Sequence, residues 1–131
     1  MRLVSLAPGS TEILYALGCK PVAVTRFCDY PLHAKQRPKV GGWLDIDYRR
    51  LQELQPDLVC TSPFVQDRVV AELERRKIDV VHVDPVTLDG VFESIMVIGT
   101  AVNRQPETHE LVVAMKARQS RHETSRQLAL M

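Results

Sequence analysis

The residues whose types suggest chemistry gather in one long connection, residues 25–46, which reads TRFCDYPLHAKQRPKVGGWLDI. It holds Phe27, Tyr30 and Trp43, and Trp43 is the only tryptophan of the chain. Connections between a strand and a helix usually take about 2 to 6 residues, so a longer one is functional or disordered. Disordered segments contain few aromatic residues, and the prolines and glycines here stiffen and bend the backbone. We therefore expect an ordered loop whose rigid rings stack on a flat ligand.

A second interpretation of these aromatic residues is purely structural. Tyr30 and Trp43 would then cover one end of a sheet as satellite core residues. Long ordered loops usually carry function, which favours a binding rim over this alternative.

The serines show no sign of nucleophilic catalysis. Ser5, Ser10 and Ser62 lie outside any GxSxG setting, and no histidine is placed by the sequence to activate them. The turn APGSTE offers backbone N–H groups at a helix start, but the chain has neither GxGxxG nor a P-loop lysine. Because no nucleophile, base and orienting partner occur together, we expect a binding protein and not an enzyme.

The cysteines and histidines predict neither a disulfide framework nor a metal site. Three cysteines, an odd number without CxxC spacing, are most simply reduced thiols. The four histidines are scattered, and no two have the helical spacing of a metal-ligand pair. We therefore expect no intrinsic cofactor and no metal held by this chain alone, and His82 is interpreted as a packed strand residue.

Composition indicates one globular domain that has no strong positive or negative electrostatic field. Seventeen basic and sixteen acidic residues give a formal charge of +1, which would not gather nucleic acid or an anionic membrane. No apolar run approaches the roughly 20 residues that span a bilayer. The first residues lack the basic and long apolar regions of a secretory signal, so we expect a cytoplasmic location for the chain as written.

The sequence predicts strands that alternate with helices, and these elements must position the loop at residues 25–46. Short apolar runs predict four strands, at residues 2–6, 21–24, 58–61 and 79–83. Helices are expected between and after them, which predicts an α/β fold: a small parallel sheet with helices on both faces. In such sheets ligands gather at the carboxyl ends of the strands.

Helix signals are found at several places along the chain. Residues 8–11 are expected to form the turn and cap of a helix that ends at Gly18. Asp47 is the expected N-cap of a helix that stops at Pro56. Apolar spacing predicts further helices at 65–73 and 88–102, followed after Pro106 by another that carries Leu111, Val112 and Met115.

Four motifs, in order, resemble a known family of ligand-binding proteins. They are SLAPGSTEILYALG, TRFCDYP, PKVGGWLD and LQELQPDLV, and a DYP combined with a GGW is far more specific than either alone. Together they resemble the cobalamin-binding branch of the helical-backbone (iron/B12-type, class III) substrate-binding proteins of ABC transporters. The resemblance covers about residues 2–118 and matches the N-terminal lobe of that family.

The resemblance implies a division of the chain. Residues 1–104 would form one Rossmann-like lobe of a periplasmic-binding-protein fold. Residues 105–131 would begin the long backbone helix and end in a polar tail, and the C-terminal lobe would be absent. In the family, ligand lies in the cleft between the two lobes.

The function implied is the binding of a corrinoid, a vitamin B12-like ligand, as the substrate-binding component of an ABC-type uptake system reduced to one lobe. Tyr30 and Trp43 match aromatic residues that pack against the corrinoid. The remaining residues expected along the rim of the cleft are Ser10, Ser62, Phe64 and Gln66. With half of the cleft missing, cobalamin would bind at best with about micromolar to millimolar affinity.

Partners and location follow from the same resemblance. The family's transporter-docking glutamate falls at Arg49, and this reversed charge would be repelled by the arginines of an ABC permease. A fragment of a typical family member would act in the periplasm or outside the cell.

Two alternatives keep the fold and change the function. The first is an iron chelate or siderophore as ligand, which basic side chains such as Arg26, Arg37 and Lys39 would favour. The second is a non-transport cytoplasmic assembly or sensing module, whose half-cleft would pair with a second copy or with a missing C-terminal lobe.

Overall fold

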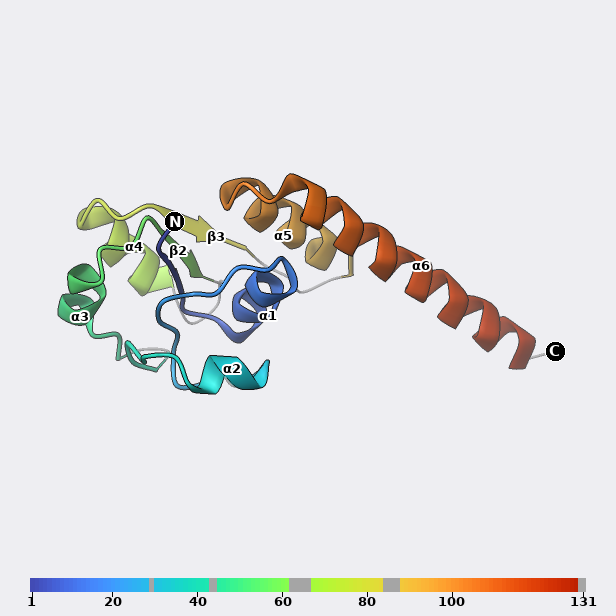
Figure 1. The fold of residues 1–131 in the computed structure, drawn as a ribbon, viewed down its shortest axis with the longest axis horizontal. Coiled ribbons are helices and arrows are strands. Elements are labelled where there is room, and N and C mark those ends of the chain that lie inside the picture. Colours follow the sequence, from blue (N-terminus) through green and yellow to red (C-terminus); the bar gives the residue numbers. More distant parts are fainter. Residues whose placement is uncertain (29, 43–44, 62–66, 84–87, 130–131) are drawn as a thin grey trace.

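The computed structural model describes residues 1–28, 30–42, 45–61, 67–83 and 88–129, with side chains of the last helix described as far as Arg121. Within these ranges a lobe of strands and helices is followed by one long helix that extends away from it (Figure 1). The α/β class predicted from the sequence is confirmed.

The sheet is parallel, as predicted, and its central strand is β2. β1 (Leu3–Ser5), β2 (Leu58–Thr61) and β3 (Val80–His82) lie in the order β1-β2-β3. The predicted strand at residues 21–24 is reduced to a bridge beside β1, where Ser5 N donates to the Ala23 carbonyl at 3.1 Å. On its other side Val24 forms a second parallel bridge, to Lys39.

Helices cover both faces because alternate strand residues point to opposite sides. On one face, Leu3, Leu58 and Cys60 pack with α1 (Pro8–Ala16) and α5 (Leu88–Ala101). On the other, Val4 and Val59 pack with α3 (Tyr48–Glu53) and α4 (Asp67–Arg75). The carboxyl ends of the strands are thereby left for loops.

The predicted end of the first helix at Gly18 and the predicted N-cap at Asp47 are confirmed, but the predicted start of the first helix is wrong. Gly18, with φ of 80°, follows α1, and the Asp47 carboxylate accepts a hydrogen bond from Arg50 N at 3.0 Å at the start of α3. α1 begins at Pro8, several residues earlier than expected, because proline needs no hydrogen-bond partner in the first turn and fits there. Ser10 and Thr11 are therefore buried helical residues.

The long helix α6 (Gln105–Ala129) is held by close packing on α5. A Cβ atom at Gly99 would lie 1.8 Å from Thr108 Oγ1, so the two helices touch where the glycine has no side chain. Thr108 Oγ1 donates to the Arg104 carbonyl at 2.7 Å, and Asn103 adopts φ of 60° in the turn between the helices. This contact sets the direction in which α6 leaves the lobe (Figure 1).

We expect Gly99→Ala to lower the free energy of unfolding by about 1 to 3 kcal/mol, because the added methyl group forces α5 and α6 apart. Urea unfolding followed by circular dichroism measures the change. Thr100→Ala, at an exposed neighbouring position, should change stability by less than about 0.5 kcal/mol. Equal effects of the two substitutions would contradict the close contact.

Candidate functional site

The loop at residues 25–46 follows Val24, which forms a β-bridge, and backbone hydrogen bonds tie the loop to this residue. Val24 N donates to the Pro38 carbonyl at 2.9 Å, and Val40 N donates to the Val24 carbonyl at 3.0 Å. Arg26 N continues this pairing by donating to the Gly41 carbonyl at 2.9 Å. The two ends of the loop are thus held side by side, and α2 (Leu32–Lys35) forms between them.

A buried polar cluster anchors the first residues of the loop to β1 and α1. Thr11 Oγ1 lies 2.8 Å from Ser5 Oγ and 3.1 Å from Cys28 Sγ, and Thr25 Oγ1 lies 3.2 Å from the same sulfur. Cys28 is 1% exposed and stands two residues before Tyr30. The cluster therefore fixes the backbone from which the Tyr30 ring projects.

The predicted ligand residues do not all share one surface. Tyr30 is 67% exposed, as a stacking platform requires. Ser10 is 2% exposed, and its Oγ has no hydrogen-bond partner among the described residues. The other four predicted contacts lie outside the described residues: Trp43, Ser62, Phe64 and Gln66.

An ion pair closes the far end of the loop. Arg26 Nη2 lies 2.5 Å from Asp45 Oδ2, and Asp45 Oδ1 accepts a hydrogen bond from Gly42 N at 3.0 Å. The hydrogen bond from Arg26 holds the pKa of the Asp45 carboxyl below its ordinary value. Gly41 has φ of 130°, and a Cβ there would lie 2.2 Å from the Asp45 carbonyl oxygen.

The cations that an anionic chelate would need are each engaged within the protein. Arg26 pairs with Asp45. Arg37 Nε donates to the Tyr15 hydroxyl at 3.3 Å, and Lys39 Nζ donates to the Ala34 carbonyl at 2.8 Å. Of the three, only Arg26 is paired with an opposite charge; Arg37 and Lys39 bond neutral groups and keep their positive charge.

A polar pair lies at the carboxyl ends of β2 and β3. Thr61 Oγ1 and His82 Nδ1 are hydrogen-bonded at 2.7 Å, and His82 Nε2 lies 3.9 Å from Asp67 Oδ1. The His82 side chain is 32% exposed, so it is a strand-end residue at the surface and not the fully packed residue expected from the sequence.

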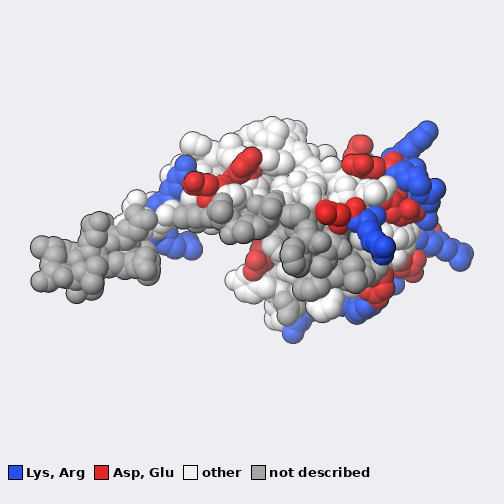
Figure 2. Space-filling view, turned by 180° about the vertical axis from the view of Figure 1, so that it is seen from behind, with Lys and Arg blue, Asp and Glu red and all other residues white. Residues whose placement is uncertain are grey.

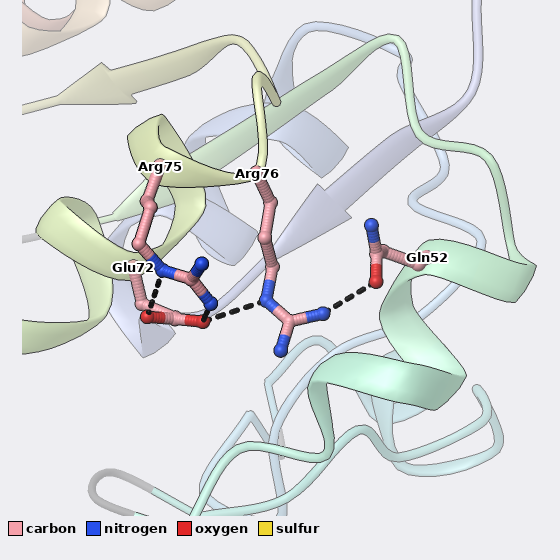
Figure 3. A network of polar contacts seen from close by, with 4 residues as sticks. All are labelled: Gln52, Glu72, Arg75 and Arg76. Carbon is pink, nitrogen blue, oxygen red and sulfur yellow. Dashed lines mark hydrogen bonds and ion pairs between the residues drawn. The ribbon is translucent and has the colours of Figure 1, made fainter.

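Charged side chains of both signs gather at the end of the lobe away from α6 (Figure 2). There Glu72 Oε1 lies 2.6 Å from Arg75 Nη2 and 2.7 Å from Arg76 Nε, and Arg76 reaches Gln52 on α3 (Figure 3). Hydrogen bonds from Arg75 and Arg76 lower the pKa of Glu72 to about 2. This network joins α3 to α4 and is structural.

Arg49, where the sequence resemblance leads us to expect a transporter-docking glutamate, also lies on α3. Its side chain is 91% exposed, and Arg49 Nε lies 3.3 Å from Glu53 Oε1. The charge at this position is thus partly offset by a neighbour on the same helix.

A separate apolar pocket of about 390 Å³ opens between α1, α5 and α6. Of the predicted ligand residues, the two that the structure describes, Ser10 and Tyr30, are not among its lining residues. Its walls include Ile13, Val91, Ile95, Leu111 and Met115.

Thiol and metal chemistry find no site in the described part of the chain. Cys19, Cys28 and Cys60 are buried, and burial, with a smaller contribution from Cys19, raises the pKa of the Cys60 thiol to about 12. Among the described residues, no group of three or more histidine, cysteine or acidic side chains could hold a metal ion. None of the helices in those ranges combines the length and the apolar character that a membrane span requires.

The family model for periplasmic binding proteins matches residues 3–125. The chain belongs to the periplasmic binding protein family. Two similar members are named vitamin B12-binding proteins. That of Pectobacterium carotovorum subsp. carotovorum (strain PC1) is 35% identical over 115 residues, covering 83% of this chain and 40% of its own length. That of Vibrio campbellii (strain ATCC BAA-1116) is 39% identical over 97 residues, covering 72% and 35%.

Solved structures of the family show the same lobe. The periplasmic vitamin B12-binding protein BtuF of Vibrio cholerae has a TM-score of 0.82 at 27% identity, covering 95% of this chain and 50% of its own. A periplasmic heme-binding protein from Pseudomonas aeruginosa also has a TM-score of 0.82, at 22% identity, which shows the fold alone. The chain spans half or less of the length of these relatives, and the predicted family and single-lobe fold are confirmed.

The anchors of the loop were missed by sequence reasoning. Cys28, Arg26 and Asp45 each act through a partner far along the chain. In the sequence, only the paired glycines before Trp43 indicated that two backbone segments approach closely. The short distance from Gly41 to the Asp45 backbone confirms this.

We expect Gly41→Ala to cost about 1 to 3 kcal/mol more of unfolding free energy than Gly18→Ala. Both positions have positive φ, but a Cβ at Gly18 meets nothing within 4 Å, whereas one at Gly41 collides with the Asp45 backbone. Chemical denaturation of both variants tests this, and similar costs would show that the turn is not tightly closed.

The Glu72 network predicts a pH dependence. Because the folded-state pKa of Glu72 is lowered to about 2, its contribution is present above the usual glutamate pKa and is lost as pH falls towards about 2. The stability difference between the wild type and Glu72→Gln, measured by denaturation between about pH 6 and pH 2, should shrink as pH falls. A stability difference that stays constant over this pH range would contradict a stabilising role of the ionised Glu72.

Proposed function

We propose that this lobe binds a corrinoid, with cobalamin as the ligand, as part of the substrate-binding component of an ABC-type uptake system. The observation that carries the proposal is that Tyr30 is 67% exposed on a loop that a buried contact between Cys28 and Thr11 anchors to α1. The vitamin B12-binding relatives, at 35% and 39% identity, support this ligand class.

In this proposal Tyr30 and Trp43 form the stacking surface. A corrin ring is broad and largely apolar at its faces, so rigid aromatic rings contact it with little loss of side-chain entropy. Ser62, Phe64 and Gln66 follow β2 and are assigned to the rim. Ser10 is buried, so residues of the first turn of α1 must shift before its hydroxyl can meet a ligand.

The division of the chain is part of the proposal. Residues 1–104 form the ligand-binding lobe, and residues 105–131 begin the backbone helix that leads to a second lobe in the relatives. The relatives' greater length supports this reading. The periplasm, where the solved relatives are found by name, is the compartment that fits an uptake role.

Binding without catalysis is the proposed activity, since the matched family consists of binding proteins. An ABC permease is the proposed macromolecular partner. With Arg49 exposed where the family's glutamate would lie, docking through α3 depends on neighbouring acidic residues such as Glu53.

Iron-chelate binding is the second candidate. A possible iron-binding protein from Staphylococcus epidermidis shares the fold at 28% identity and a TM-score of 0.79 over 88% of this chain. The neutralisation of Arg26 by Asp45 favours the corrinoid, whereas Arg37 and Lys39 keep the positive charge that an anionic chelate would use.

Calorimetric titration with cyanocobalamin tests the proposal. We expect saturable binding in the range of about micromolar to millimolar, weakened by Tyr30→Ala and by Trp43→Ala. Val113→Ala is the control, because Val113 is a 53% exposed apolar residue on α6, away from this loop, and its truncation should leave binding unchanged.

Two outcomes would contradict corrinoid binding. The first is no heat up to about millimolar ligand with all proteins folded by circular dichroism. The second is tighter binding of a ferric siderophore than of cyanocobalamin in competition.

A further inference from the structure

The apolar pocket beside α6 leaves aliphatic side chains open to solvent. Ile13 of α1 and Leu111 and Met115 of α6 are among its walls, and all three are only partly buried. An exposed apolar surface of this kind commonly marks an interaction site. Since α6 extends away from the lobe, a second helix can lie along its outer side (Figure 1).

One exposed row of side chains on α6 borders this pocket. Its members recur every three or four positions, which places them on the same side of the helix. They are Glu110, Ala114, Arg118 and Arg121. Leu111, a wall of the pocket, stands three positions before Ala114 and seven before Arg118, so it lies directly beside this row. The row and the pocket together are called the α6 face.

The charges along the row change sign at its centre. Glu110 stands four positions before Ala114, and Arg118 stands four positions after it. These two side chains are about 12 Å apart along the helix, too far to pair within one chain. Glu107 precedes Glu110 by three positions and Arg121 follows Arg118 by three. One end of this side of α6 is therefore acidic, and the other end is basic.

This order of charges fits a second copy of the same helix that runs in the opposite direction. With a two-fold axis beside Ala114, Glu110 of each copy faces Arg118 of the other copy, which gives two equivalent ion pairs. A parallel arrangement in register would set like charges against each other, which is unfavourable. The short side chain of Ala114 lets the two helices approach closely where they meet.

We propose that the α6 face is the interface of a symmetric dimer, in which α6 of a second copy packs antiparallel along this side and covers the pocket. Burial of the aliphatic pocket walls supplies the attraction, and the ion pairs set the register. No residue of the α6 face belongs to the loop at residues 25–46. The inference therefore goes beyond the proposed function, and its failure would leave corrinoid binding standing.

Sedimentation equilibrium of the full chain tests dimer formation. The wild type should pass from monomer to dimer as its concentration rises from about 1 to about 500 µM, as expected of a small and partly polar interface. A wild type that stays monomeric up to about 500 µM overturns the proposal.

A charge exchange tests the antiparallel pairing. Glu110→Arg places like charges against each other at both ends of the interface and should weaken dimer formation by at least about 10-fold. Arg118→Glu should have the same effect. The double variant Glu110→Arg/Arg118→Glu restores opposite charges across the interface and should dimerise within about threefold of the wild type. Because the two positions do not meet within one chain, this recovery reports a contact between copies.

Cross-linking tests the position of the two-fold axis. Ala114→Cys should be joined into a covalent dimer by a short bismaleimide, whereas the native cysteines Cys19, Cys28 and Cys60 are buried. His109→Cys is the matched control, because it is exposed on the same helix but lies about 140° around it from Ala114. This control should cross-link much less.

The remaining outcomes bear on separate parts of the proposal. Dimer formation that neither single charge change weakens, or that the double variant does not restore, overturns the antiparallel pairing on the α6 face. Equal cross-linking of the two cysteine variants overturns the position of the axis. All substituted side chains are exposed, so circular dichroism of each variant should match that of the wild type.

Discussion

The hydrogen bonds between Thr11, Ser5 and Cys28 tie the loop at residues 25–46 to the sheet and to α1. Most buried hydroxyl groups find partners within the protein, and here these residues hold one another in place at the end of β1. The loop can present aromatic side chains to solvent because its base is fixed in this way. Without the cluster, exposed rings would be expected to collapse against the core.

The other end of the loop is also fixed by internal contacts. Gly41 and Gly42 allow the backbone to approach Asp45 closely, and Arg26 closes the contact with its side chain. Asp45 neutralises Arg26 here, and the same loop exposes the large apolar side chains of Phe27, Tyr30 and Leu32. Exposed aromatic rings suit a ring-shaped ligand with apolar faces.

Sequence patterns predicted the elements better than the contacts between them. The apolar runs at Leu3 and Leu58 predicted β1 and β2, and Asp47 marked a helix start, because these signals are local. The sequence predicts a turn at Pro8, whereas α1 begins there, because proline fits both a turn and the first turn of a helix. The pairing of Cys28 with Thr11 joins residues 17 positions apart, and no local pattern encodes it.

The central claim is that ligand binds on the aromatic loop and not in the apolar pocket between α1, α5 and α6. Amide chemical shifts of the isotope-labelled chain, followed by nuclear magnetic resonance during titration with cyanocobalamin, separate the two surfaces. We predict shifts at Phe27, Tyr30 and Gly42, with those of Gln52 and Glu72 in the α3–α4 network unchanged. Shifts confined to pocket residues such as Ile13 and Leu111, or no shifts at all, would contradict the account.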